Sequence, residues 1–430
     1  MRTSRIFSIE NPLKFKDQLL SWGRQFQEIV WLDSNDDDSR TGEYEALLAV
    51  EAFTAIKTDY VNAFDKLKEY QETTADWIFG YLSYDLKNDV ERLKSLNHDG
   101  LHFPDLYFFQ PQKLIFIKDD QIEFRYLRVV DDEIEDDFEQ IQNFQSDISS
   151  DRVPIKVESR ISKNEYLDKI GKMLNHIHRG DIYEANFCQE FYAENVEIDP
   201  FNIYSSLNEI STPPFAAYLK LENFNLISAS PERYLKKKGV QLLSQPIKGT
   251  ARRAEDAQED RKIADELAND PKEQSENVMI VDLVRNDLSR IAKKGSVKVK
   301  ELCKVYTFKQ VHQLVSSVTA EISDDIPPVE ALRTSFPMGS MTGAPKISAM
   351  KIIEELEESK RGVYSGAVGY FTPKGDFDFN VVIRSILYNS ENKYLSFSVG
   401  GAITAKSDPE KEYEECLLKA KAMWEVLTNL

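Results

Sequence analysis

The pattern of apolar and polar positions along the chain predicts a mixture of strands and helices. Runs rich in aromatic and β-branched residues, bounded by turn-forming residues, predict strands at 75–86, 112–130, 214–230, 239–244 and 394–403. Three longer segments with apolar residues three and four apart predict helices at 260–292, 343–360 and 408–427. This mixture indicates an α/β or α+β layered architecture rather than a helical bundle.

Two acidic stretches interrupt this pattern. Residues 33–39 and 130–141 carry adjacent like charges, which cannot share a core, and both stretches therefore predict solvated loops. The second stretch marks a boundary between an N-terminal region, 1–145, and a C-terminal region, 146–430. No internal repeat with a fixed period is present.

The composition excludes several classes of protein. A chain of 430 residues with 41% hydrophobic content can bury a large core. Its net charge of -19, without a block of basic residues, argues against a nucleic-acid partner. The sequence contains no secretory signal and no membrane-spanning apolar run, so we expect a soluble cytoplasmic protein with no membrane partner. Three widely spaced cysteines match neither a zinc site nor a disulfide framework and are expected to pack in the interior: Cys188, Cys303 and Cys416.

The last predicted helix carries acidic residues in a regular spacing. Ser407 and Glu410 predict a capping box at its start. Glu412, Glu415 and Lys419 then share one face, half-turned toward the core. These glutamates could simply complement the positive end of the helix dipole, or they could form part of a site.

A second glutamate pair has the same spacing. Glu273 and Glu276 stand directly before the apolar run 278–284. If the two pairs converged on a cleft, four carboxylates would repel one another unless a hard cation neutralised them. Oxygen ligands without histidine suit Mg²⁺, so convergence of the pairs would create a magnesium site.

Three other features carry candidate chemistry. The loop 336–350 runs into a helix, where free N–H groups could bind an anion, although a capped loop without a ligand fits equally well. Arg384 lies in the strand-like run 381–387 and needs a carboxylate partner from the protein or from a substrate. Lys248 precedes a Gly-Thr turn, a setting that by itself is typical of a solvated lysine. No nucleophile and base arrangement for glutamine hydrolysis is present.

Together, these motifs resemble the family of chorismate-utilising enzymes, which includes anthranilate synthase component I and the isochorismate and salicylate synthases. The matching stretches occur in the family's order between about residues 155 and 427: GDIYEANFCQEF, SASPERYL, PIKGTARR, ENVMIVDLVRNDLSRI, FPMGSMTGAPK, RGVYSGAVGY, VIRSI and GGAITAKSDPEKEYEECLLKA. The resemblance implies an α+β fold of two facing antiparallel β-sheets flanked by helices, with the active site in the cleft between them.

The resemblance also implies roles for individual residues. Glu276 and Glu415 would be the principal Mg²⁺ ligands, with Glu273 and Glu412 in support, and the metal would hold the ring carboxylate of chorismate. Eight further residues would contact the substrate, of which the first four would hold its enolpyruvyl carboxylate: Tyr364, Arg384, Gly401, Ala402, Lys419, Gly249, Thr250 and Thr342.

Lys248 distinguishes the branches of this family. Anthranilate synthases typically carry alanine at this position, whereas the branch that forms aminodeoxychorismate carries lysine. In that branch the lysine is understood to attack C2 of chorismate as the C4 hydroxyl leaves, after which ammonia adds at C4. The amine must be neutral to attack, and we expect Mg²⁺, Arg252 and Arg253 to lower its pKa.

Two positions depart from the family pattern. Glu184 stands where the water-adding members carry a lysine base, which argues against water addition, but the amine-forming branch usually has glutamine there. The family's usual histidine is replaced by Gln313, with His312 beside it. Either residue, or neither, would assist the leaving group.

The sequence thus predicts an enzyme that converts chorismate and ammonia to 4-amino-4-deoxychorismate with Mg²⁺, for p-aminobenzoate and folate synthesis. A separate glutamine amidotransferase (glutaminase) subunit is expected to supply the ammonia, because the chain ends at Leu430 with no such domain fused to it. One alternative is an anthranilate synthase component I. A remoter one is a non-catalytic chorismate-site partner of an amidotransferase.

Overall fold

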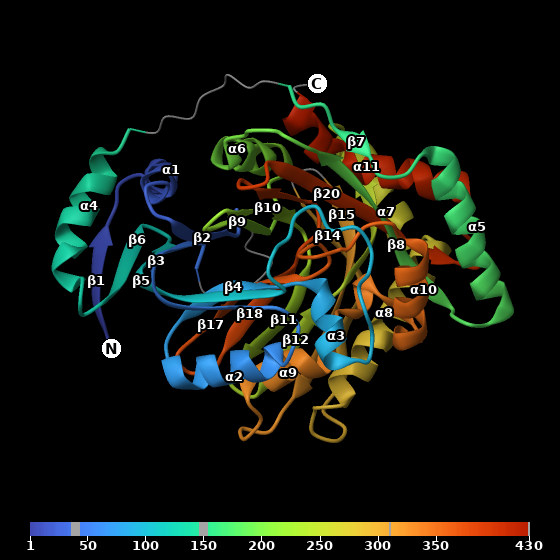
Figure 1. Cartoon of the computed structure of the whole chain (residues 1–430), viewed down its shortest axis with the longest axis horizontal. Coiled ribbons are helices and arrows are strands. Elements are labelled where there is room, and N and C mark those ends of the chain that lie inside the picture. The colour runs from blue at the N-terminus through green and yellow to red at the C-terminus, as the bar shows by residue number, and fades with distance from the viewer. Residues whose placement is uncertain (36–43, 146–153, 309–310, 429–430) are drawn as a thin grey trace.

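The structure is a computed structural model that describes residues 1–35, 44–145, 154–308 and 311–428. Part of the acidic stretch predicted as a loop, 36–39, lies outside these ranges. Every pairing between the named strands is antiparallel, for example β9 with β10 and β17 with β18. Figure 1 shows the strands in facing layers with helices on the outside, which confirms the predicted fold class.

The N-terminal strands join the same sheet system as the C-terminal strands. They are β1 (Arg2–Ser8), β2 (Glu28–Asp33), β3 (Ala46–Thr58), β4 (Ile78–Leu82), β5 (Leu106–Lys118) and β6 (Gln121–Leu127). Strands are therefore confirmed in both of the early stretches predicted to contain them. Because β2 pairs with β9 and β4 pairs with β17, the two predicted regions share backbone hydrogen bonds. The boundary after residue 145 borders the undescribed residues 146–153 and stays a prediction.

The remaining strands complete the two layers. They are β7 (Glu158–Ser159), β8 (Glu184–Ala193), β9 (Phe215–Leu221), β10 (Phe224–Ser230), β11 (Arg233–Lys238), β12 (Gln241–Gln245), β13 (Ile247–Arg252), β14 (Lys298–Thr307), β15 (Val311–Glu321), β16 (Gly343–Ala344), β17 (Ala367–Phe371), β18 (Phe377–Val381), β19 (Ser385–Asn389) and β20 (Tyr394–Thr404). The expectation that Arg384 lies within a strand was wrong. It sits between β18 and β19 with φ +50°, a left-handed conformation that interrupts the regular extended backbone at this point.

The helices cover the outer faces of the sheets. They are α1 (Pro12–Gly23), α2 (Ala63–Thr74), α3 (Lys87–Val90), α4 (Ile134–Asn143), α5 (Lys163–Arg179), α6 (Pro200–Ser211), α7 (Ala257–Ala268), α8 (Pro271–Ser289), α9 (Pro328–Ser335), α10 (Lys346–Leu356) and α11 (Pro409–Thr428), with short 3-10 turns η1 (Tyr84–Leu86), η2 (Asp131–Glu133) and η3 (Gly339–Met341). Figure 1 shows α2 beside α9 below β4 and β17, and α6 and α11 above β10 and β20. The sheets thus lie between two helical layers.

The segment predicted as one helix, 260–292, forms two. The Asp270 side chain accepts hydrogen bonds from the backbone N–H groups of Lys272 and Glu273, and Pro271 occupies the first position of α8. An acceptor at the cap followed by proline is a strong start signal, so the chain breaks between α7 and α8. This break fixes where the second glutamate pair, Glu273 and Glu276, lies on α8.

Two local predictions were wrong. The acidic stretch 130–141 is not a loop but contains η2 and most of α4. Its Asp137 can be buried because the carboxylate accepts a hydrogen bond of 2.7 Å from Lys113 Nζ. The capping box at Ser407 does not form, since its Oγ accepts from the backbone of Thr404. Asp408 caps α11 instead, by accepting from the backbone N–H of residue 411.

Two of the three cysteines pack in the interior as predicted. Cys188 and Cys416 are buried, whereas Cys303 is partly exposed, and all three are free thiols. Burial raises the pKa of the Cys416 thiol to about 11, so this thiol stays protonated and unreactive at neutral pH. No helix in the described part of the chain is long and apolar enough to cross a membrane.

Candidate active site

Helices α8 and α11 bring the two glutamate pairs toward each other across a lysine. Lys272 Nζ lies 3.8 Å from Glu276 Oε1 on its own helix and 3.8 Å from Glu412 Oε1 on α11. Glu415 pairs with Lys419 at 2.7 Å on the same side of α11. The sequence spacing alone could not show this convergence, because it depends on how two distant helices pack.

Glu276 combines a buried oxygen atom with a shifted pKa. Its Oε1 atom has no hydrogen-bond partner in the described part of the chain, and burial raises the pKa of its carboxyl group to about 7. Within the described ranges, no group of three or more acidic, histidine or cysteine side chains lies close enough together to hold a metal ion as it stands. Oxygen donors with one buried, unpaired atom nevertheless fit a hard cation such as Mg²⁺.

Lys248, on β13, lies beside these carboxylates. Its Nζ is 3.6 Å from Glu184 Oε1 at the start of β8, and the two side chains are 13% and 3% exposed. Burial alone would lower the pKa of the Lys248 amine, but the charges of Glu184 and Glu276 raise it above its usual value. Lys248 is therefore a charged amine held inside the protein, not a solvated surface lysine.

The two arginines after Lys248 do not act on it as predicted. Arg252 pairs with Glu259 at 2.7 Å, and Arg253 pairs with Asp260 at 2.8 Å. Both partners belong to α7, so these guanidinium groups are held away from the amine. The expectation that they lower the lysine's pKa was wrong, because acidic neighbours set its charge state.

The residue after Lys248, Gly249, lies against the Glu273 carboxylate. Gly249 has φ +80°, and a Cβ atom there would lie 3.0 Å from Glu273 Oε2. A side chain would thus be strained and would crowd that carboxylate, so glycine lets β13 approach α8 closely. The following residue, Thr250, is exposed and stands opposite Gln313 in the β13–β15 pairing.

His312 and Gln313 differ sharply in their surroundings. His312 Nε2 lies 3.0 Å from Asp260 Oδ1, and its Nδ1 lies 2.9 Å from Thr307 Oγ1. Both ring nitrogens are thus engaged with the protein. The Gln313 amide is buried, and neither its oxygen nor its nitrogen has a hydrogen-bond partner among the residues that the structure describes. Of the two residues, Gln313 has the free hydrogen-bonding capacity that a ligand would use.

Replacing Gln313 with methionine should separate folding from function. Because the buried amide is unpaired, we expect Gln313→Met to raise the free energy of unfolding by about 1 kcal/mol. If the amide binds substrate, kcat/KM for chorismate should fall about tenfold. Urea denaturation and steady-state kinetics measure the two effects. The matched variant His312→Met should instead lower stability, because it leaves Asp260 and Thr307 without their partner.

Arg384 and a residue not predicted from the sequence, Glu232, extend the site. The Arg384 guanidinium makes no hydrogen bond or ion pair with another residue in the described ranges, and burial lowers its pKa although Glu232 acts to raise it. Glu232 is 5% exposed, and its charge also helps to raise the pKa of Lys248. It therefore lies near both cations. The sequence offered one signal for it: Glu232 is an acidic residue directly before β11, in the stretch SASPERYL.

Strand β20 lines the site beside β8. Ala402 stands opposite Asn186, and a Cβ atom at Gly401 would lie 3.3 Å from Glu412 Oε2 and 3.7 Å from Lys419 Nζ. The absence of a side chain at Gly401 therefore leaves room next to the glutamates. Lys419 also donates a hydrogen bond of 3.0 Å to the carbonyl oxygen of residue 400.

Two predicted substrate contacts have polar atoms already engaged with the protein. The Tyr364 hydroxyl accepts a contact of 3.6 Å from Cys188 Sγ. The Thr342 hydroxyl bonds to carbonyl oxygens of its own loop, while its carbonyl accepts from Asn186 N at 2.7 Å. The amine at the start of α10 is also engaged with the protein, because Lys346 Nζ donates a hydrogen bond of 2.6 Å to Asp287 Oδ2.

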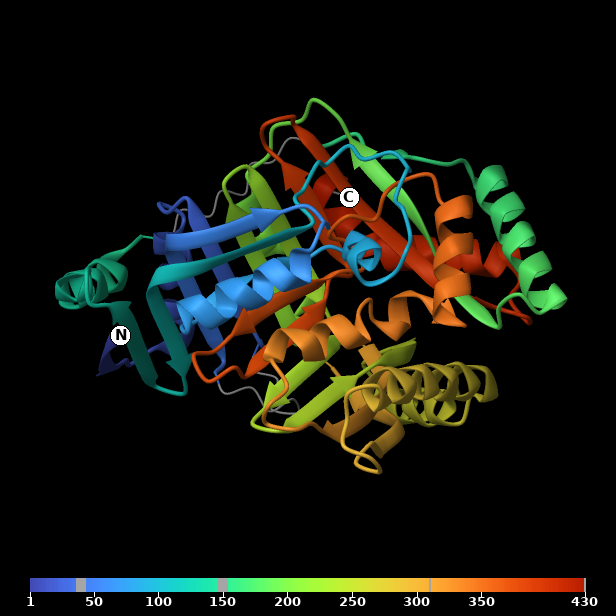
Figure 2. The same ribbon diagram turned by 60° about the horizontal axis from the view of Figure 1, so that its bottom comes forward.

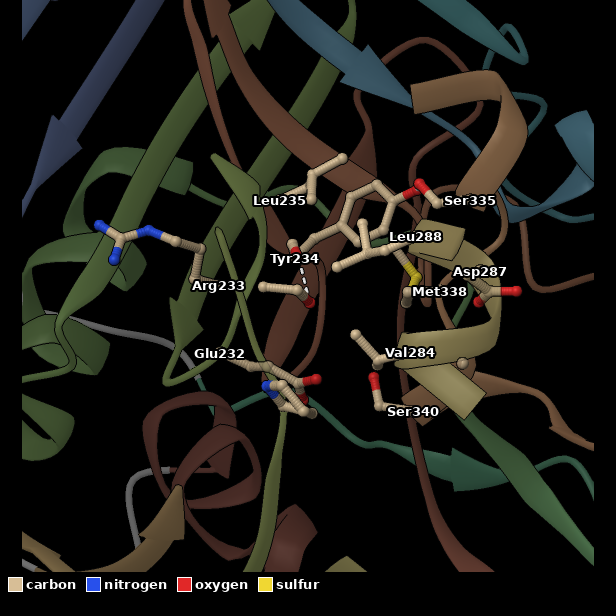
Figure 3. A pocket seen from close by; sticks show the side chains of 13 residues that line it. Glu232, Arg233, Tyr234, Leu235, Val284, Asp287, Leu288, Ser335, Met338 and Ser340 are labelled. Carbon is tan, nitrogen blue, oxygen red and sulfur yellow. Dashed lines mark hydrogen bonds between the residues drawn. The ribbon is translucent and has the colours of Figure 1, made fainter. Parts of the chain in front are cut away.

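A small cavity adjoins this cluster of charged residues. Figure 3 shows the wall of the cavity, in which the Tyr234 side chain points toward Ser335. The Tyr234 hydroxyl oxygen lies 2.7 Å from Ser335 Oγ. Glu232 belongs to the cavity lining and, through its charge, to the cluster around Lys248. No other residue discussed for the site lines this cavity except Asp287. The charged cluster thus lies next to the cavity and not within it.

Comparison with known proteins gives a family match over nearly the whole chain. The model of a family described as chorismate binding enzyme matches residues 21–425. An aminodeoxychorismate synthase component 1 from Salmonella typhimurium is 40% identical over 272 residues, which cover 63% of this chain and 59% of that protein. The alignment thus spans less than two thirds of that relative's length.

Two further comparisons cover more of the chain. An anthranilate synthase component 1 from Thermus thermophilus is 34% identical over 375 residues, which cover 80% of this chain and 76% of that protein. The crystal structure of anthranilate synthase component I from Streptococcus pneumoniae superposes with a TM-score of 0.79 at 27% identity, covering 88% of this chain and 91% of that chain. The fold is therefore shared along most of both chains.

Proposed function

This chain belongs to the family of chorismate binding enzymes, and we propose that it is component 1 of an aminodeoxychorismate synthase. It would convert chorismate and ammonia to 4-amino-4-deoxychorismate, an aminated precursor of p-aminobenzoate and folate. Relatives bearing this name from Salmonella typhimurium and Escherichia coli are 40% and 41% identical to the chain over 272 and 258 residues.

The observation that carries this proposal is the position of Lys248. Its amine is buried next to Glu184 at 3.6 Å and within the field of Glu276. A lysine that is largely buried among carboxylates, near the start of β13, is not a typical solvated surface lysine. It is suited to covalent chemistry, in which a neighbouring carboxylate accepts the ammonium proton and frees the nitrogen lone pair.

The proposed reaction uses the residues already described. Lys248, after losing its proton to Glu184, attacks C2 of chorismate, both ring double bonds shift by one position, and the C4 hydroxyl takes the proton from Glu184 and leaves as water. Ammonia then forms a bond to C4, the two double bonds shift back, and the bond between C2 and Lys248 breaks, which restores the free lysine. Arg384 would hold a substrate carboxylate, because its guanidinium is available for a bidentate pair.

The four glutamates of α8 and α11 would hold Mg²⁺ in this proposal. When bound, the metal would neutralise these carboxylates and hold the ring carboxylate of the substrate. Glu276 Oε1 has no hydrogen-bond partner among the described residues, and the Lys272 amine lies 3.8 Å from it and 3.8 Å from Glu412 Oε1; both observations support a cation at this position. Mg²⁺ suits the site because every side chain offered is an oxygen donor.

Ammonia would come from a separate amidotransferase subunit. The curated relatives are named component 1, which implies a second component of those enzymes. In the part of the chain that the structure describes, the three cysteines are free, and Cys188 and Cys416 are buried, whereas a nucleophile for glutamine hydrolysis must be accessible. The partner would therefore provide the glutamine chemistry.

One alternative is supported by a specific observation. The anthranilate synthase relative aligns with 80% of the chain, a longer stretch than the 63% aligned with the Salmonella typhimurium relative. An anthranilate synthase would also eliminate pyruvate from the aminated ring. The two reactions differ in product, so product analysis separates them.

Purified protein incubated with chorismate, Mg²⁺ and ammonium should form 4-amino-4-deoxychorismate, detected by liquid chromatography and mass spectrometry. Anthranilate fluorescence should stay at the level of a control without enzyme. Strong anthranilate fluorescence together with pyruvate release would contradict the proposal and favour the alternative. Consumption of chorismate without ammonium would contradict both.

A further inference from the structure

Arg361 is a buried cation that the proposed reaction does not use. Its Nε donates to Glu357 Oε2 at 2.9 Å, and its Nη2 donates to Glu357 Oε1 at 2.7 Å. Its remaining donors reach the carbonyl oxygens of Met341 at 2.6 Å and Asn186 at 2.8 Å. The guanidinium thus joins α10's end to two other segments through four hydrogen bonds.

Each of these segments carries a residue of the candidate site. Asn186 lies two residues after Glu184 on β8, and Met341 directly precedes Thr342. Glu357 Oε1 also accepts from the backbone N–H of Cys188 at 2.9 Å, and the Cys188 thiol contacts the Tyr364 hydroxyl. A shift of the Arg361–Glu357 pair would therefore displace several predicted substrate contacts at once.

Two residues of the N-terminal region, Tyr84 and Asp85, contact Arg361 and the residue after it. The backbone N–H of Tyr84 donates to the carbonyl of Gly362 at 2.7 Å, and Asp85 Oδ2 accepts from the N–H of Gly362 at 2.9 Å. The Tyr84 ring also lies beneath the guanidinium, 4.5 Å from Arg361 Cζ. Figures 1 and 2 both show the adjoining α3 beside α10, where Lys87 lies 3.7 Å from Glu354.

We propose that Arg361 and Glu357 are positioning residues, and that Tyr84 and Asp85 of the N-terminal region hold them in place. The pair sets the relative positions of β8, the loop at residue 341 and Tyr364, and so sets the affinity for chorismate. Bidentate pairing suits this role, because it fixes both distance and orientation. The inference rests on the proposed function, which makes chorismate the substrate and places Glu184 of β8 beside the reactive Lys248.

Tyr84 offers a test with a matched control. Tyr84→Leu removes the aromatic face under the guanidinium, and we expect it to raise the KM for chorismate about tenfold while kcat changes by no more than about twofold. Tyr84→Phe keeps the ring and removes only a hydroxyl that is buried without a hydrogen-bond partner. This control should have the kinetics of the unaltered enzyme.

A merely structural role would give a different result. Loss of folded protein lowers the apparent kcat and leaves KM unchanged, because the remaining molecules have a normal site. An unchanged KM in Tyr84→Leu, together with a lower melting temperature, would therefore overturn the proposal. Should Tyr84→Leu fail to fold, Arg361→Lys serves as the second variant, since it keeps the charge and loses the bidentate geometry.

Chorismate binding distinguishes this proposal from the proposed function. The dissociation constant can be measured by isothermal titration in a Lys248→Ala background, where covalent reaction does not compete. Adding Tyr84→Leu should weaken binding about tenfold, whatever product the enzyme forms. If the unaltered enzyme makes no aminodeoxychorismate but this shift is seen, only the proposed function fails. If the product forms but the dissociation constant is unchanged, only the positioning role fails.

Discussion

Replacing Lys248 with alanine is expected to lower the ammonia-dependent turnover of chorismate by about 10³-fold or more. Loss of a nucleophile removes the covalent route entirely, which costs more than loss of a binding contact. Steady-state assays with saturating ammonium measure the change. Because Glu184 and Glu276 would lose the positive charge beside them, the melting temperature should be recorded in the same samples to correct for unfolded protein.

Mass spectrometry tests the chemistry behind this loss. Intact protein incubated with chorismate and Mg²⁺, without ammonia, should carry an adduct with the mass of chorismate minus water on Lys248, and Lys248→Ala should not. Lys262→Ala, which removes an exposed lysine paired with Glu266 on α7, is the matched control and should leave turnover and adduct unchanged. Full activity of Lys248→Ala would refute the covalent role, and loss of activity without any adduct would favour charge neutralisation alone.

The second large effect is expected at Glu276. Glu276→Gln should weaken Mg²⁺ binding by about 100-fold or more and lower kcat/KM at limiting Mg²⁺ by a similar factor. Without metal, the same change should stabilise the protein at pH above about 7, since it removes a buried negative charge that burial disfavours, as the raised pKa of Glu276 shows. Isothermal titration with MgCl₂ and thermal unfolding in a chelator measure these opposite effects.

The opposite signs make this prediction specific to a metal site. An exposed carboxylate such as Glu266 provides the control, because Glu266→Gln should change neither quantity. A Glu276→Gln variant that binds Mg²⁺ normally would remove Glu276 from the ligand set. A variant that loses both stability and activity would show that its carboxylate supports the fold instead.

Much of the fold was predictable because its elements carry local signals. Strands β5 and β6 follow from apolar runs divided by the turn at Asp119 and Asp120, and α11 follows from its apolar stripe. The break between α7 and α8 was missed, although Asp270 and Pro271 mark it. Apolar residues continue at helical spacing across the break. This periodicity predicted one continuous helix and outweighed the cap signal at Asp270 and Pro271.

The charged cluster was predictable only in part. The spacing of Glu273 with Glu276 places both carboxylates on one face of a helix, which is a local property. The surroundings of Gln313 and His312 depend on the β13–β15 pairing and on α7 packed against it, which no local pattern encodes. Glu232 was missed for the same reason, since its neighbours Lys248 and Arg384 are distant in sequence.

The pairing of β2 with β9 and of β4 with β17 has a consequence for shortened chains. Without residues 1–127, the backbone N–H and C=O groups along one side of Phe215–Leu221 and Ala367–Phe371 would lose their partners. Unpaired strand edges of this kind, flanked by buried apolar residues, template association between molecules. A chain trimmed to residues 128–430 should therefore aggregate, even though it retains Lys248 and all four glutamates.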